Sequence, residues 1–307
     1  MTGRPRFPLL AELTAADGTR LVLRCLRAPG ERGERAPVLV LLPAMGTPAR
    51  QYAPFVRALN QRELTVVTVD PRGHGESTPR AARAVPCGYR EVVEQDIGAV
   101  LEAVRDRLPH AERTYLVGHS LGGQLGLIHA ALYAPELAGA VLVAAGSAWH
   151  RCFPLRARLR WLGVGAAGSP LARLLGHWPG ATLGIGDREG ARLMRDWARQ
   201  ARTGRYRAEG SRHDYERALA GLELPVLAVD VEDDALAPPA AVDHLCGKLP
   251  SRSVTRWHYP RSAARGKPLG HFRWVRHNAA LVERIAAWTG AEEPEPPTPP
   301  RTRETAR

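Results

Sequence analysis

The hydrophobic positions of the chain alternate between short apolar runs and longer segments with helical spacing. The short runs are typical of strands in a sheet that is buried on both faces, and they cover Pro37–Leu42, Leu64–Val69, Thr114–Val117, Ala138–Ala144, Pro225–Val231 and Ser253–Tyr259. The segments with helical spacing are Gln51–Asn60, Glu91–Leu108, Gly122–Tyr133, Pro239–Leu249 and Phe272–Trp288. This alternation predicts an α/β fold class, a doubly wound and mostly parallel sheet with helices on both faces.

Three stretches depart from the alternation and suggest how the chain is divided. Two β-prone runs around Asp17-Gly18, Leu9–Leu13 and Arg20–Arg24, indicate an N-terminal hairpin. Residues 149–221 have few branched runs but hold five tryptophans and phenylalanines, which predicts a mainly helical lid inserted between two strands. We therefore expect a flexible N-terminus (1–8), a core in two parts (9–148 and 222–290), the lid, and a disordered Pro-rich tail (291–307).

The candidate chemistry starts at Gly118-His119-Ser120-Leu121-Gly122, which follows the run Thr114–Val117 and precedes a helical segment. G-x-S-x-G between a strand and a helix is the pattern of a nucleophile elbow, where a strained turn exposes the serine above the sheet. Glycines flank the serine because a Cβ there would collide with the neighbouring strand or helix. At such a turn the Leu121 amide would point to where an oxyanion forms.

An activated serine also needs a base and a carboxylate that orients the base, both at the same edge of the sheet. Glu232, Asp233 and Asp234 follow the strand Pro225–Val231, and His271 lies between the last strand and the last helix. The order Ser, Asp, His is that of α/β-hydrolases. We interpret His119 as a packing and hydrogen-bonding residue, and His74 as structural.

Over residues 9 to about 290 the chain resembles an α/β-hydrolase. More narrowly, it resembles a bacterial subgroup of predicted hydrolases akin to the serine aminopeptidase/monoacylglycerol lipase-like branch. The closer match lies in Leu42–Arg50, Val117–Gln124, Leu183–Gly186, Glu232–Asp234 and Gly270–Phe272.

The resemblance implies roles for individual residues. It implies Ser120 as the nucleophile, His271 as the base and, four residues before Pro238, Asp234 as the acid. It also implies a second oxyanion amide at Met45, with Ala44 as the alternative, because Pro43-Ala44 replaces the common His-Gly of the family at this turn.

These observations predict a serine hydrolase of small or medium hydrophobic carboxylic esters, acting through an acyl-enzyme without a metal or organic cofactor. An amide or peptide hydrolase and an acyltransferase are alternatives on the same residues. A ligand-binding receptor with a retained, slow triad is the alternative outside enzymes. Lid tryptophans that face the serine would shape an apolar acyl pocket.

Composition narrows the range of partners. The net charge of +12 comes from 43 basic residues, of which only Lys248 and Lys267 are lysine. The arginines are spread along the chain, as codon bias in a GC-rich genome would produce, so we expect a small-molecule substrate and no nucleic acid.

The four cysteines form no C-x-x-C pair, which suggests free thiols. Without a signal peptide or a run of 18 apolar residues, we expect a cytoplasmic location and no membrane span. The oligomeric state is left open.

Overall fold

A computed structural model describes residues 7–15, 17–30, 33–80, 87–133, 136–183 and 188–290. Within these ranges the main sheet has eight strands, in the order β1-β2-β4-β3-β5-β6-β9-β10. They are β1 (Leu9–Thr14), β2 (Arg20–Leu26), β3 (Val38–Leu42), β4 (Thr65–Val69), β5 (Thr114–His119), β6 (Gly139–Val143), β9 (Val226–Val231) and β10 (Val254–Tyr259). The strands from β4 to β10 pair in parallel, and β2 pairs antiparallel with both β1 and β4. The predicted fold class is thus confirmed.

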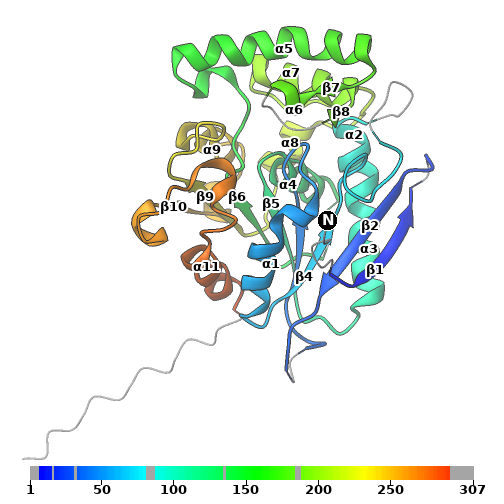
Figure 1. The fold of residues 1–307 in the computed structure, drawn as a ribbon, viewed down its shortest axis with the longest axis vertical. Coiled ribbons are helices and arrows are strands. Elements are labelled where there is room, and N and C mark those ends of the chain that lie inside the picture. The colour runs from blue at the N-terminus through cyan, green and yellow to red at the C-terminus, as the bar shows by residue number, and fades with distance from the viewer. Residues whose placement is uncertain are drawn as a thin grey trace, which may run out of the picture.

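The described helices are distributed over both faces of the sheet (Figure 1). They include α1 (Ala53–Asn60), α2 (Tyr89–Glu91), α3 (Ile97–Arg107), α4 (Leu121–Tyr133), α9 (Pro239–Cys246), α10 (Gly270–Arg273) and α11 (Ala279–Thr289), with a π-helical turn (Val92–Asp96) between α2 and α3. Side chains of α1 and α11 share one hydrophobic core cluster, and those of α3 and α4 belong to the other. This is the arrangement of a doubly wound sheet, in which β5 lies between β3 and β6.

The chain between β6 and β9 is mainly helical. It forms α5 (Leu155–Leu175), α6 (Gly180–Leu183), α7 (Ala191–Thr203) and α8 (Tyr215–Ala220), with a small pair of strands, β7 (Trp178–Pro179) and β8 (Arg188–Glu189). Helices α5 and α7 pack against each other at the top of Figure 1, whereas α8 packs against α4. The role of residues 149–221 as a lid stays a prediction.

The C-terminal helix differs from the predicted Phe272–Trp288. The chain instead forms one turn, α10, and then α11. The break occurs because Trp274 is fully buried, with its ring edge-on to Phe55 at 5.1 Å, and because the Asn278 side chain donates to the Val275 carbonyl. His271 therefore lies within α10, where we expected a loop.

Some predicted features lie outside the described residues: most of the flexible N-terminus, the tail 291–307 and the stretch 184–186. Among the helices that the structure does describe, none combines the length and the apolar character that crossing a membrane requires.

Candidate active site

Ser120 occupies a sharp turn between β5 and α4. Its φ of 53° is in the left-handed region, which is unusual for a residue with a side chain. A Cβ on Gly118 would come within 2.1 Å of the Gly123 Cα, and one on Gly122 within 2.3 Å of the Pro43 carbonyl oxygen. The glycines thus allow β5, the start of α4 and the turn after β3 to approach closely, with Ser120 at their junction.

Three of the predicted site residues form one hydrogen-bonded chain. Nε2 of His271 lies 3.0 Å from Oγ of Ser120, and Nδ1 of His271 lies 2.8 Å from Oδ2 of Asp234. The residues come from three separate elements: the turn after β5, the loop after β9, and α10. Such an arrangement can pass a proton from a hydroxyl to an imidazole whose tautomer a carboxylate holds.

The neighbouring carboxylates Asp233 and Asp234 have different surroundings. Asp234 is buried, and its Oδ1 accepts hydrogen bonds from the amides of Leu236 and Ala237 at 2.8 and 2.9 Å. Asp233 instead binds the Arg261 guanidinium, whose hydrogen bond lowers the pKa of the Asp233 carboxyl. Only Asp234 of the two contacts His271, and its role as the orienting acid stays a prediction.

The turn after β3 contributes Ala44 and Met45 to the same cavity wall as Ser120. Leu121 is the first residue of α4, so its amide has no acceptor within the helix. The amide of Ala44 donates to the hydroxyl of Tyr52 at 2.9 Å. Because this hydrogen bond occupies Ala44, the geometry favours Met45 as the second amide that an oxyanion could use.

Tyr52 is a residue whose position the sequence did not reveal. It appears there only as an apolar position of a predicted helix, and nothing in its spacing points to Ala44. In the structure it is buried, and its hydroxyl also lies 2.6 Å from Nδ1 of His119.

His119 is buried directly beneath the site. Burial lowers the pKa of its imidazole well below the ordinary value, and the nearby His271 lowers it further. Its ring lies 4.7 Å from that of His271 and edge-on to those of Phe272 and Trp274. A neutral, packed imidazole fits the predicted structural role.

A cavity of about 90 Å³ opens above Ser120 and His271. Three aromatic side chains from the segment between β6 and β9 line it, namely Phe153, Trp161 and Trp197. Phe272 and Leu236 complete much of its apolar wall. The other two tryptophans of that segment lie elsewhere: Trp178 is buried in the protein core, and Trp149 packs against His244.

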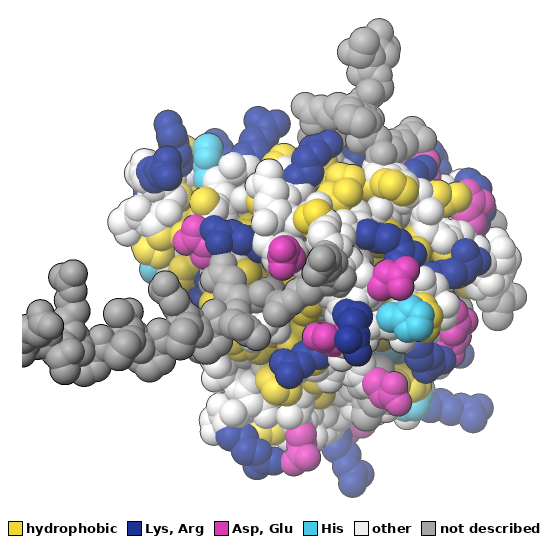
Figure 2. Space-filling view, turned by 90° about the horizontal axis from the view of Figure 1, so that it is seen from below, with side chains coloured by type: hydrophobic (Ala, Val, Ile, Leu, Met, Phe, Trp, Pro, Cys, Tyr) yellow, Lys and Arg dark blue, Asp and Glu magenta, His cyan; other side chains and the backbone are white. Residues whose placement is uncertain are grey.

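On the face shown in Figure 2, basic and acidic side chains are interspersed and do not form one basic stripe. The four cysteines are free. Among the described residues, no group of three or more His, Cys, Asp or Glu side chains is placed to hold a metal ion.

Comparisons with known proteins agree with this architecture. The family model described as "Serine aminopeptidase, S33" matches residues 33–263. The chain is 30% identical over 236 residues to "Putative carbamate hydrolase RutD" of Pantoea ananatis, with 72% of this chain and 80% of that protein covered.

Two solved structures illustrate the similarity of fold. A soluble variant of monoglyceride lipase from Saccharomyces cerevisiae superposes with a TM-score of 0.69 at 15% identity, covering 94% of this chain and 96% of that one. The esterase RhEst1 from Rhodococcus sp. ECU1013 has a TM-score of 0.58 at 21% identity, with 92% and 99% covered.

Proposed function

Because the chain belongs to the serine aminopeptidase S33 family and is an α/β-fold hydrolase, we propose that it is a serine hydrolase of hydrophobic carboxylic esters. The observation that carries this proposal is the hydrogen-bonded chain from Ser120 through His271 to Asp234 at a cavity with aromatic walls. In this proposal Ser120 is the nucleophile, His271 the general base and Asp234 the orienting acid.

The first half of the reaction forms an acyl-enzyme. Nε2 of His271 takes the proton of Ser120 as Oγ attacks the ester carbonyl carbon. Asp234 holds the proton on Nδ1 and stabilises the imidazolium. The amides of Leu121 and Met45 bind the negative oxygen of the tetrahedral intermediate. The imidazolium then gives its proton to the leaving alcohol, and the bond between that oxygen and the carbonyl carbon breaks.

The second half uses water in place of the alcohol. His271 deprotonates the water, which attacks the acyl carbon, and the intermediate collapses when Ser120 Oγ recovers its proton. The acid is released and the enzyme returns to its starting state. Each of these steps uses side chains and amides of this chain.

The substrate class follows from the walls of the cavity. Phe153, Trp161 and Trp197 would bind apolar parts of a substrate, and we propose residues 149–221 as the lid that carries them. Each buried methylene contributes roughly 0.8 kcal/mol, so catalytic efficiency should rise with the size of the apolar groups that the site buries, until the site is full. We keep a small-molecule substrate, a cytoplasmic location and the absence of nucleic-acid binding as predictions.

Carbamate hydrolysis is the second candidate, and the similarity to the RutD protein favours it. The same serine, base and oxyanion amides could act on a carbamate carbonyl. The aromatic walls fit a hydrophobic ester better, since they offer a small polar carbamate few hydrogen-bonding partners.

A screen of p-nitrophenyl esters from acetate to decanoate, run beside carbamate and aryl amide substrates, tests the proposal. We expect ester turnover, and labelling of the enzyme by a fluorophosphonate probe. Labelling with negligible turnover of every substrate would favour a ligand-binding receptor. Preferential turnover of carbamates or amides would move the assignment to those substrates.

A further inference from the structure

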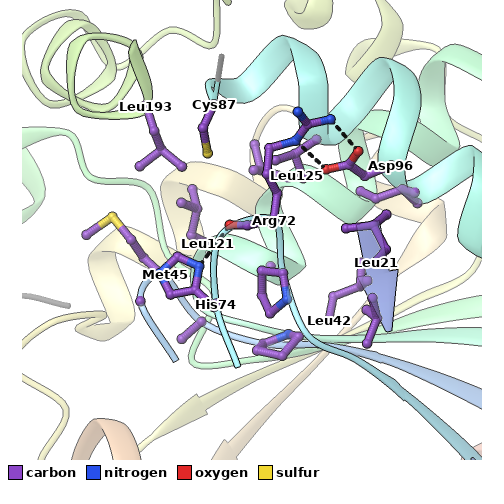
Figure 3. A pocket seen from close by; sticks show the side chains of 18 of the residues that line it. Leu21, Leu42, Met45, Arg72, His74, Cys87, Asp96, Leu121, Leu125 and Leu193 are labelled. Atoms are coloured by element: carbon purple, nitrogen blue, oxygen red, sulfur yellow. Dashed lines mark hydrogen bonds and ion pairs between the residues drawn. The ribbon is translucent and has the colours of Figure 1, made fainter. Parts of the chain in front are cut away.

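A second cavity, of about 70 Å³, adjoins the first at the turn after β3 (Figure 3). The two cavities share Ala44, Met45 and Leu121 as lining residues. Ser120 and His271 line the first cavity and, among the described residues, are not part of the wall of the second. The second cavity therefore lies beyond the oxyanion amides, on the side away from His271.

The wall of this second cavity is mainly hydrocarbon. Leu21, Leu42, Leu125 and Leu193 surround it, as Figure 3 shows, and Val100 lies in the same wall. Cys87 contributes a small buried thiol, which behaves as an apolar group.

The charged residues at its edge are occupied with one another. The Arg72 guanidinium donates to both carboxylate oxygens of Asp96 at 2.9 and 2.7 Å and to the hydroxyl of Thr19 at 2.9 Å. It also binds the Asp17 carboxylate. Nδ1 of His74 lies 3.0 Å from the Arg72 carbonyl, and its Nε2 lies 3.4 Å from the carboxylate of Glu189, a buried residue that also lines the cavity. The cavity thus suits a saturated carbon chain better than a polar or charged group.

The proposed reaction determines which part of an ester points there. In the tetrahedral intermediate, the carbon bonded to Ser120 Oγ carries an oxyanion, a leaving oxygen and an acyl chain. The leaving oxygen must lie beside Nε2 of His271, which gives it a proton. The oxyanion faces the amides of Leu121 and Met45. The acyl chain takes the remaining direction, away from His271.

From this geometry, and resting on the proposed function, we infer that the cavity beyond Met45 binds the acyl chain, whereas the aromatic cavity binds the leaving group. Met45 is half-buried and lines both cavities. Its unbranched side chain has three rotatable bonds, so it can turn aside when an acyl chain enters. The substrate class is an unbranched, saturated acyl ester whose alcohol carries an aromatic or other bulky apolar group.

Val100 and Val104 offer a matched pair of sites on α3. Each is 1% exposed. Val100 lines the second cavity, whereas Val104, in the part of the chain that the structure describes, lines neither cavity. Val100→Ala enlarges the cavity and Val100→Leu narrows it. Val104→Ala removes the same atoms from an equally buried position without changing either cavity.

The experiment measures kcat/KM for two ester series with the wild type, these three variants and Trp161→Ala. The first series keeps p-nitrophenol and varies the acyl chain from acetate to decanoate. The second keeps butyrate and varies the alcohol. In the first series, Val100→Leu should move the optimum to shorter chains and Val100→Ala to longer ones. The ratio between neighbouring chain lengths should change about fourfold at the optimum, the effect of one buried methylene. Val104→Ala should keep the wild-type profile.

The second series tests whether the aromatic cavity binds the leaving group. Trp161→Ala should alter the alcohol profile, and the Val100 variants should leave that profile as in the wild type. Folded Val100 variants that keep the wild-type acyl profile, or that change the alcohol profile instead, would overturn the inference. If Val100→Leu does not fold, the acyl-chain profiles of Val100→Ala and Val104→Ala are compared, and a shift in Val100→Ala alone supports the inference. A wild type that hydrolyses no ester would refute the proposed function itself and this inference with it.

Discussion

The hydroxyl of Tyr52 lies 2.6 Å from Nδ1 of His119, in a part of the protein closed to solvent. The same hydroxyl accepts a hydrogen bond from the Ala44 amide. The ring of His119 packs in turn against that of His271. Tyr52 thereby connects the turn after β3, which holds Ala44 and Met45, to His119, the residue that packs against the proposed base His271.

Tyr52→Phe should lower kcat more than it changes KM. The substitution leaves the Ala44 amide and Nδ1 of His119 buried without a partner, which costs about 1–3 kcal/mol of stability. The turn that carries Met45 then loses a fixed support. We expect kcat to fall about tenfold to a hundredfold, because displacements near 1 Å at a reacting centre can cost about 10²-fold. Steady-state ester kinetics and urea unfolding measure the two effects.

Tyr115→Phe is the matched control for that experiment. Tyr115 is also buried, and its hydroxyl donates to the Thr289 carbonyl at 3.1 Å, far along the sheet from Ser120. It should lose stability while keeping the wild-type kcat. An equal fall in kcat for both variants would show that Tyr52 acts only through stability.

Asp234→Asn should reduce kcat by about 10⁴-fold. Both carboxylate oxygens of Asp234 accept from N–H groups, one from His271 and the other from Leu236 and Ala237. An asparagine that keeps its oxygen on the two backbone amides turns its NH2 group toward Nδ1 of His271. The imidazole then carries its proton on Nε2, which is the wrong tautomer for a base. The measurement is kcat for the best ester, with circular dichroism as the check on folding.

Asp233→Asn serves as its control and should keep kcat within a few-fold of the wild type. Asp233 binds Arg261 and has a φ of 67°, a conformation that asparagine adopts readily. If Asp233→Asn were the more damaging variant, the orienting acid would have to be reassigned one residue back.

The parts of the fold that the sequence predicted are those that local pattern determines. The buried runs such as Val38–Leu42 and Val226–Val231 form strands almost where the hydrophobic pattern placed them. Gly118 and Gly122 marked the elbow because only glycine permits such close approach of backbone. Ser120, the cluster Glu232–Asp234 and His271 could be singled out because parallel strands bring their carboxyl ends to one edge. The resemblance to the family then selected Asp234 within that cluster.

The parts that the sequence did not predict depend on contacts between distant residues. The helix over Phe272–Trp288 breaks because Trp274 packs against α1, and no local pattern encodes that contact. The hydrogen bond between Ala44 and Tyr52 depends on the course of the turn after β3. The second cavity is enclosed by side chains of β2, β3, α3, α4 and α7, so it exists only in the folded protein.

Stability should decrease in mild acid, partly through His129. Burial lowers the pKa of this imidazole, whose Nδ1 lies 2.7 Å from the Val93 carbonyl. In the unfolded chain a histidine binds a proton below about pH 6.5. The unfolded state therefore takes up the proton first, and the free energy of unfolding falls as the pH drops through this range. The lowered pKa of His119 acts with the same sign.

His129→Asn tests that contribution, because an asparagine amide can still donate to the Val93 carbonyl but does not titrate. Urea unfolding at pH 7.5 and at pH 5.0 should show a smaller loss of stability for His129→Asn than for the wild type. His110→Asn, at an exposed position, should retain the wild-type loss. If His129→Asn loses as much free energy of unfolding between pH 7.5 and pH 5.0 as the wild type does, His129 does not contribute to the loss.

The hydrolysis of a p-nitrophenyl ester by Ser120→Ala tests most directly whether Ser120 is the nucleophile. The variant removes only Oγ from the turn between β5 and α4. Its circular dichroism spectrum and its melting temperature should therefore stay close to those of the wild type. Removal of the nucleophile in a comparable triad costs about 10⁶-fold in kcat, and what remains comes from binding and the oxyanion amides. We predict a loss of this order, together with loss of fluorophosphonate labelling at residue 120. A folded Ser120→Ala variant that hydrolyses the ester at the wild-type rate would show that Ser120 is not the nucleophile.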